Sequence, residues 1–115
     1  MPTAKRLKTN AELCEEADAL PEPYVGEVID GVLYTMARPT PAHANVESEI
    51  GGHLRFGGGG GSPLAGWYIQ AEVEVRFATD EKCVPDLSGW RNERIAGHRN
   101  DNPILITPDW VCEIL

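Results

Sequence analysis

Two apolar runs near the C-terminal end of the sequence each contain one carboxylate, and these runs restrict the possible folds more than any other feature. The runs are Val84–Leu87, which contains Asp86, and Trp110–Leu115, which contains Glu113. Both have the apolar composition of buried strands. An ionised carboxylate in such a place costs several kcal/mol unless it is paired, hydrogen-bonded or bound to a metal. Two such residues in successive predicted strands indicate a shared electropositive ligand, and a divalent cation is the simplest candidate.

The neighbours of the two carboxylates refine this hypothesis and leave an alternative open. In extended geometry Cys83 and Cys112 point away from the adjacent carboxylates, which favours core thiols over cysteine metal ligands. Pro85 cannot donate a hydrogen bond to a neighbouring strand, so it predicts a bulge or an edge beside Asp86. The alternative is that Asp86 accepts hydrogen bonds in a turn and that Glu113 pairs with an arginine. The candidates for that pairing are Arg91, Arg94 and Arg99.

The charge balance of the chain limits the classes of partner. The 115 residues are enough for one domain, and the net charge is −8, from 18 acidic and 10 basic residues. A domain that binds nucleic acid by neutralising phosphates is usually basic, so general nucleic-acid binding is disfavoured. A nuclease is not excluded, because bound metal ions offset its acidic site. The cysteines and histidines show no metal-ligand spacing, and the lack of a long apolar segment predicts a cytoplasmic protein without a membrane span.

Local signals in the first third of the sequence predict a helix followed by a β-hairpin. Residues 1–8 are polar and are expected to be a disordered N-terminus. Thr9 and Glu12 have the spacing of a capping box, which predicts the start of a helix. Asp30 and Gly31 lie between two apolar runs, and an Asp-Gly pair in this context is the strongest short signal for a hairpin. The predicted ranges are 10–19 for the helix and 24–29 and 32–36 for the two strands.

The rest of the sequence predicts a second helix and further strands around a glycine-rich loop. Thr40 is the expected N-cap of that helix, and Pro41 is its first residue. Glu72 and Glu74 fall on the polar face of an alternating strand, so we expect them on a solvated face or at the rim of a site. The expected fold class is α/β, with a mixed sheet and two helices packed against it. The predicted ranges are 57–66 for the flexible loop, 67–77, 82–90 and 109–115 for the strands, the last of them central in a covered sheet, and 93–96 for one helical turn.

Four segments, taken in their order along the chain, carry a resemblance to a known family. Because of these four segments, the sequence resembles the bacterial family of putative restriction endonucleases in the PD-(D/E)XK nuclease superfamily. The resemblance extends from about Asn10 to Leu115. The four segments are Glu27–Gly31, a Pro-Thr-Pro-x-His helix start that ends in His43, Val84–Leu87, and Pro108–Leu115.

The resemblance implies a restriction-endonuclease-like α/β fold and a metal-dependent endonuclease that hydrolyses DNA. Asp86 matches the Asp of the Pro-Asp motif and Glu113 matches the acidic residue of the next strand, so together they are implied to hold Mg²⁺ or Mn²⁺. Glu27 matches the acidic residue of the first strand and is implied as a third ligand or a water-orienting group. This agrees with the preference of hard divalent ions for carboxylate oxygens. His43 matches a helix-start position, where we expect a structural role. A homodimer is compatible with the resemblance.

One departure from the family pattern concerns a lysine. In the superfamily a lysine usually lies two residues after the second acidic residue, and here that position is Leu115. In this family the lysine tends to come from a later helix, which the sequence does not contain. We therefore expect residues 9–115 to be an incomplete restriction-endonuclease-like domain with impaired cleavage. The alternative is a non-catalytic remnant or an interaction domain that retains the nuclease fold.

Overall fold

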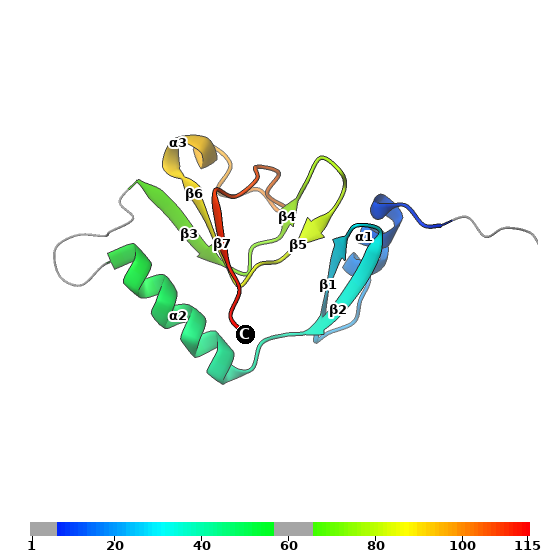
Figure 1. Cartoon of the computed structure of the whole chain (residues 1–115), viewed down its shortest axis with the longest axis horizontal. Helices are drawn as coiled ribbons and strands as arrows, with labels where there is room; N and C mark the ends of the chain where they lie inside the picture. The colour runs from blue at the N-terminus through cyan, green and yellow to red at the C-terminus, as the bar shows by residue number, and fades with distance from the viewer. Residues whose placement is uncertain (1–6, 57–65) are drawn as a thin grey trace, which may run out of the picture.

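The strands of the chain form two sheets, and the named strands pair only in antiparallel fashion (Figure 1). The strands are β1 (Tyr24–Ile29), β2 (Val32–Ala37), β3 (Trp67–Ala71), β4 (Val75–Arg76), β5 (Lys82–Cys83), β6 (Leu87–Arg91) and β7 (Trp110–Cys112), and the helices are α1 (Asn10–Asp18), α2 (Pro41–Phe56) and α3 (Asn92–Ile95). The strand orders are β2-β1-β5-β4 and β3-β6-β7. The α/β class is confirmed, although two antiparallel sheets replace the expected single mixed sheet.

The computed structural model describes residues 7–56 and 66–115. Two predictions therefore lie wholly or largely outside the described residues: the disordered N-terminus at 1–8 and the flexible loop at 57–66. In the described segments no helix is long and apolar enough to cross a membrane.

Helix α1 begins at the predicted capping box and packs on the first sheet. The Thr9 Oγ1 atom accepts a hydrogen bond from the N–H of Glu12 (3.1 Å), and the Glu12 carboxylate accepts one from the N–H of Thr9 (3.1 Å). This reciprocal pair satisfies two donors that a helix start otherwise leaves open. The buried face of α1, which includes Leu13 and Ala17, lies against Val28 of β1 and forms the first core. The predicted helix is confirmed.

The hairpin of β1 and β2 turns at the predicted residues. Asp30 has a φ of 49° and Gly31 a φ of 75°. A two-residue hairpin turn of this type needs positive φ at both positions, which Asp and Gly tolerate best. Ile29 and Val32 are the first cross-strand pair after the turn. The predicted hairpin is confirmed.

Two strands that the sequence predicts as continuous, 67–77 and 82–90, are each broken in the middle. The first break separates β3 from β4 and contains Glu72, whose φ is 51°; the second separates β5 from β6 and contains Pro85. The N–H of Glu72 donates a hydrogen bond to the carbonyl oxygen of Asp86 (3.1 Å), so the two breaks lie side by side. The prediction of two continuous strands was wrong. Alternation of apolar and polar residues indicates which side chains are buried, but it does not indicate where a strand bends. At the breaks both strands pass from one sheet to the other.

The second core lies beside the second sheet and contains a buried tryptophan. Val75, Trp90, Ile95 and Ile104 are each exposed by 2% or less. The indole N–H of Trp90 donates a hydrogen bond to the carbonyl oxygen of Ile106 (2.7 Å), which satisfies its polar atom. Ile95 belongs to α3, so the helical turn that the sequence predicts here is confirmed.

Helix α2 runs alongside β3 and is fixed at both ends (Figure 1). At its start the Thr40 Oγ1 atom accepts a hydrogen bond from the N–H of His43 (3.2 Å), as an N-cap does. Near its end the Nε atom of Arg55 donates a hydrogen bond to the carbonyl oxygen of Ile69 in β3 (2.9 Å). These contacts confirm the second helix and give its side chains a defined position relative to the sheet.

Strand β7 differs from its prediction as a central, covered strand. In the described part of the chain it pairs with β6 on one side. Its central residue, Val111, is 51% exposed. The prediction of a central strand that is covered on both faces is therefore wrong for the described residues, although its apolar residues fall on both faces.

Candidate functional site

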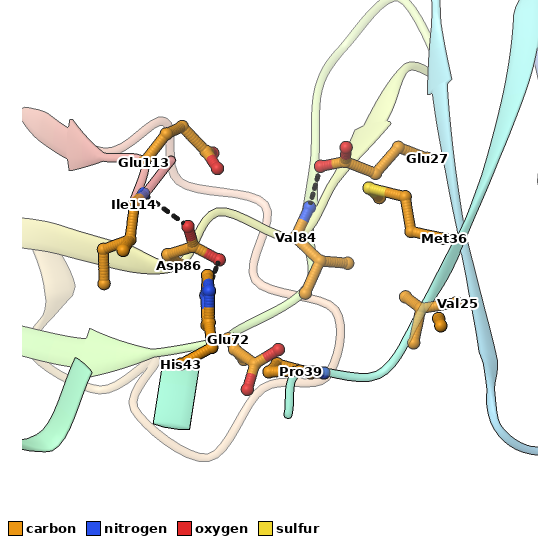
Figure 2. A pocket seen from close by; sticks show the side chains of 11 residues that line it. Val25, Glu27, Met36, Pro39, His43, Glu72, Val84, Asp86, Glu113 and Ile114 are labelled. Atoms are coloured by element: carbon orange, nitrogen blue, oxygen red, sulfur yellow. Dashed lines mark hydrogen bonds and ion pairs between the residues drawn. The ribbon is translucent and has the colours of Figure 1, made fainter. Parts of the chain in front are cut away.

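A pocket of about 260 Å³ lies at the junction of the two sheets, next to both strand breaks (Figure 2). Segments that are far apart in the sequence contribute to its wall: the hairpin, the start of α2, the two breaks and the segment after β7. The lining residues are Val25, Glu27, Met36, Ala37, Pro39, His43, Glu72, Val84, Asp86, Glu113 and Ile114. Four of them are carboxylates, and none of the described lining residues is a lysine or an arginine.

Asp86 is held in the pocket by contacts from three other segments. Its Oδ2 atom accepts a hydrogen bond from the N–H of Ile114 (2.6 Å), and its carbonyl oxygen accepts the bond from Glu72. Its Oδ1 atom lies 3.2 Å from the Nε2 atom of His43. The irregularity that Pro85 predicts next to Asp86 is confirmed, and it aligns this carboxylate with neighbours from distant segments.

Glu113 lies in the same pocket as Asp86, just beyond the end of β7. Partial burial raises the pKa of Glu113 above its ordinary value, and the carboxylates of Asp86 and Glu27 raise it further. Electrostatic repulsion of this kind acts over short distances, so the three carboxylates form one group. Figure 2 shows the side chains of Asp86 and Glu113 on the same side of the pocket. The two predicted metal ligands are thus brought together; metal binding by them stays a prediction.

The alternative from the sequence, in which Glu113 pairs with an arginine, is not what the structure contains. Arg94 pairs with Asp109 at 2.6 Å. The guanidinium groups of Arg91 and Arg99 stack on aromatic rings, each 4.9 Å from the ring centre. The same alternative also predicted that Asp86 accepts hydrogen bonds in a turn. Asp86 does accept a backbone hydrogen bond through one carboxylate oxygen.

Glu27, the third predicted site residue, connects the first sheet to the second strand break. Its Oε2 atom accepts a hydrogen bond from the N–H of Val84 (2.7 Å), and Figure 2 shows its carboxylate across the pocket from Asp86. This bond orients one of its two oxygens.

Helix α2 adds two residues that sequence reasoning did not assign to the site, His43 and Glu47. The His43 Nε2 atom lies 3.2 Å from the Oε1 atom of Glu47 and 3.2 Å from the Oδ1 atom of Asp86. The side chain of Glu47 is only 4% exposed. A signal was present in the sequence, because residues four apart on a helix share a face. It was missed because nothing in the sequence places this face against Asp86.

The electrostatics of these groups reflect an excess of negative charge. Burial, reinforced by the nearby carboxylates of Glu72 and Asp86, raises the pKa of Glu47 to about 7. The contact with Asp86 raises the pKa of His43 above its ordinary value, against the opposing effect of burial. Glu72 is exposed and lies at the rim of the pocket, as its position in the sequence predicts. One imidazole therefore faces several carboxylates, a donor set that suits a cation.

The lysine that is most buried in the described residues is used elsewhere. Lys82, with a side chain 5% exposed, pairs with Asp18 of α1 at 2.9 Å and with Glu74 at 3.1 Å. The pair with Asp18 bridges α1 to the first sheet. Glu74 thus has a structural partner, and Lys82 is not among the described residues that line the pocket.

Comparison with known proteins gives two matches. Residues 14–115 match the model of the Uma2 family, described as "Putative restriction endonuclease". Among solved structures, the chain is similar to a protein from Anabaena variabilis ATCC 29413 described as "a putative nuclease", with a TM-score of 0.65 and 27% sequence identity over 94% of this chain and 58% of that chain. The chain therefore spans a little over half the length of that protein. No curated protein matches the sequence.

Proposed function

Since the chain belongs to the Uma2 family of putative restriction endonucleases, we propose that it is a nuclease that hydrolyses phosphodiester bonds of DNA with a divalent cation. The observation that carries the proposal is the convergence of Glu27, Asp86 and Glu113 on one pocket. These residues come from three segments of the chain, and the described lining residues include no lysine or arginine. Carboxylates gathered in this way repel one another unless a cation lies between them.

The donor set fits Mg²⁺ or Mn²⁺. Asp86 and Glu113 would hold the ion through carboxylate oxygens, which hard divalent cations prefer. When bound, such an ion activates water and neutralises negative charge that develops on a phosphodiester. A fit is supported by two buried atoms, His43 Nε2 and Glu47 Oε1, that have no hydrogen-bond partner among the described residues.

The side chains of this pocket have separate roles in the proposed reaction. The N–H of Ile114 fixes the carboxylate of Asp86 at 2.6 Å, and the N–H of Val84 fixes Glu27 at 2.7 Å. Held in this way, the two carboxylates lose little conformational entropy when a cation and substrate bind. Glu27 has one oxygen available to orient a water molecule. DNA is the proposed substrate and the cytoplasm the proposed location.

The residue two positions after Glu113 is Leu115, where the superfamily usually has a lysine, and this departure favours a second candidate function, a non-catalytic domain that retains the nuclease fold. Loss of one electrostatic stabiliser of a developing charge commonly lowers a rate by ~10²–10³-fold. We therefore expect little or no DNA cleavage by the chain of 115 residues with Mg²⁺ or Mn²⁺.

A single substitution tests the proposed chemistry and separates the two candidates. Residues two apart on an extended segment share a face, so Leu115→Lys would place an ammonium group beside Glu113 on the pocket side. We expect this variant to nick supercoiled DNA at least about tenfold faster than the parent chain in Mg²⁺. The gain should disappear when Asp86→Asn is added and persist with Glu49→Gln, which removes a charge from an exposed position of α2. Cleavage that survives Asp86→Asn, or no cleavage by the Leu115→Lys chain, would contradict the nuclease proposal.

A further inference from the structure

We propose that Arg55, Arg91 and Arg99, which gather around the start of β3, bind the phosphate backbone of DNA at a distance from the carboxylate pocket. These three residues are called the arginine group below. The inference rests on the proposed function, because it takes DNA as the substrate, and it adds the surface that holds this substrate outside the pocket.

The arginine group is distinct in this acidic chain because its members form no ion pair. In residues 7–56 and 66–115, all other lysines and arginines lie within 4 Å of an aspartate or glutamate oxygen, whereas these three do not. The paired residues are Lys8, Arg38, Arg76, Lys82 and Arg94. The chain has a net charge of −8, so unpaired positive charge gathered at one place marks a surface for an anionic partner.

Three successive residues of β3 hold the arginine group together. The contacts are Arg55 with Ile69 (2.9 Å from Nε to the carbonyl oxygen), and Arg91 with Trp67 and Arg99 with Tyr68 (each 4.9 Å from the guanidinium carbon to the ring centre). Arg55 comes from the end of α2, Arg91 from the end of β6, and Arg99 from the segment after α3. Figure 1 shows the end of α2, the start of β3 and α3 at the same end of the second sheet.

Stacking on the aromatic rings leaves guanidinium donors available for phosphate. A guanidinium group stacks through its flat face, whereas its five N–H donors lie at the edge. Arg91 and Arg99 are exposed, and Arg99 uses one donor for the Oδ1 atom of Asn92 (3.1 Å). A guanidinium that is already held in place loses less freedom when it binds an anion.

A second pocket, of about 350 Å³, lies next to Arg99 and offers space for a phosphate group. Its described lining residues include no carboxylate, in contrast to the pocket around Asp86; they are Ala96, Gly97, Arg99 and Asn100. The nearest acidic residues in the sequence are already paired. Asp101 lies 2.8 Å from His98, and Asp109, whose charge also acts on Arg91, lies 2.6 Å from Arg94.

Helix α2 connects the arginine group to the carboxylate pocket. His43 lines that pocket, and Arg55 follows it by twelve residues on the helix. A rise of 1.5 Å per residue places the two about 18 Å apart along the helix axis. Duplex DNA rises about 3.4 Å per base pair, so this separation corresponds to about five base pairs. One duplex along α2 can therefore contact both, and the arginine group supplies positive charge that the described lining of the carboxylate pocket lacks.

The salt dependence of DNA binding tests the arginine group, because each phosphate contact with a duplex adds about 0.9 to the slope of log affinity against log salt. The chain is titrated with a short labelled duplex in Ca²⁺ between roughly 50 and 200 mM salt. We expect Arg91→Gln and Arg99→Gln each to weaken binding and to reduce the magnitude of the slope by about one unit.

The matched control is Arg38→Gln, which changes the net charge equally but removes a guanidinium that Glu22 holds at 2.8 and 2.9 Å. We expect this chain to keep the slope of the parent. Arg99→Lys retains the charge and should also keep it. Equal slopes for the Arg38→Gln and Arg99→Gln chains, or no binding of the duplex by the parent chain at the low end of the salt range, would overturn the proposal.

Two outcomes separate this inference from its neighbours. Displacement of the labelled duplex by poly-L-glutamate as readily as by unlabelled duplex would indicate an acidic protein as the partner and would overturn the assignment to DNA. The slope does not depend on cleavage. A chain that shows the expected slopes but does not cut DNA in Mg²⁺ would therefore support the arginine group and remove only the proposed chemistry.

A measurement on the unmodified chain keeps the test independent of variant folding. Phenylglyoxal reacts with accessible guanidinium groups, and mass spectrometry locates the modified arginines. We expect duplex DNA in Ca²⁺ to protect Arg91 and Arg99 and to leave the reactivity of Arg38 unchanged. Equal modification of Arg91 and Arg99 with and without DNA would contradict the proposal.

Discussion

Asp86 has more connections to the pocket than any other single residue described above. It accepts a hydrogen bond from Ile114 through its side chain and one from Glu72 through its backbone, and it contacts His43. Its charge also contributes to the raised pKa of Glu47 and of Glu113. At the scale of residues, the pocket is a set of carboxylates that share this neighbour. Their protonation is therefore linked to folding.

Glu47 makes the stability of the metal-free chain depend on pH. Its pKa in the folded chain is about 7, above the ordinary 4.5, because burial and the carboxylates of Glu72 and Asp86 raise it, against the opposing effect of His43. Folding thus favours the protonated form, and this contribution is fully present below about pH 4.5 and is lost as the pH rises through 7. We expect the melting temperature in EDTA to fall over this range, and Glu47→Gln to flatten the fall.

The matched variant for this prediction is Glu49→Gln, which should leave the pH profile of the melting temperature unchanged because Glu49 is exposed. Addition of Mn²⁺ should also reduce the fall, since an ion favours the ionised carboxylate. A profile that is the same in the parent and Glu47→Gln chains would show that Glu47 is not the titrating group.

At the scale of elements, the packing of α1 on β1 depends on a glycine. A Cβ atom at Gly26 would lie 2.7 Å from the Cβ atom of Ala17, closer than real carbon contacts. The helix therefore approaches the strand more closely than any other residue at position 26 allows. This contact brings the hairpin, and with it Glu27, to its place beside the second strand break.

We expect Gly26→Ala to destabilise the chain by about 1–3 kcal/mol, because overpacking forces α1 away from β1. Gly52→Ala makes the same chemical change in α2, where a Cβ atom would meet nothing within 4 Å. There we expect a gain of about 0.5–1 kcal/mol from reduced freedom of the unfolded chain. Urea unfolding of both variants measures the difference. Equal effects at the two positions would mean that the close contact does not limit stability.

At the scale of the whole molecule, net charge opposes the proposed substrate. The chain carries −8 overall, and four carboxylates line the pocket. DNA is a polyanion, so approach to this surface is unfavourable until cations neutralise part of the charge. In the proposed function, the same charge that would provide metal ligands would thus make substrate binding conditional on the metal.

We expect the chain to bind duplex DNA weakly or not at all in EDTA and measurably better in Ca²⁺, which binds carboxylates but supports little cleavage in most Mg²⁺ sites. Fluorescence anisotropy of labelled DNA measures this gain. The double variant Asp86→Asn, Glu113→Gln should lose the gain, while Glu49→Gln should retain it. DNA binding of equal strength in EDTA and Ca²⁺ would show that the pocket carboxylates do not control access of the substrate.

Local sequence signals were sufficient for those elements whose determinants are neighbours in the chain. The capping box at Thr9, the Asp30-Gly31 turn and the N-cap at Thr40 each depend on atoms a few residues apart, and each is confirmed. The resemblance to the nuclease family and the α/β class are confirmed as well. The break at Pro85 was predicted only as an irregularity beside Asp86, and the break at Glu72 was not predicted, because hydrophobic alternation continues through a bend.

The sequence by itself therefore determined the local elements, the family and the identity of Glu27, Asp86 and Glu113 as candidate site residues. Only the tertiary structure decided that both long strands cross between two sheets, and that α2 presents His43 and Glu47 to Asp86. The physical reason is the range of the interactions. Capping and turn formation involve residues near in sequence, whereas the cluster around Asp86 joins positions more than thirty residues apart, whose proximity arises from packing of the whole chain.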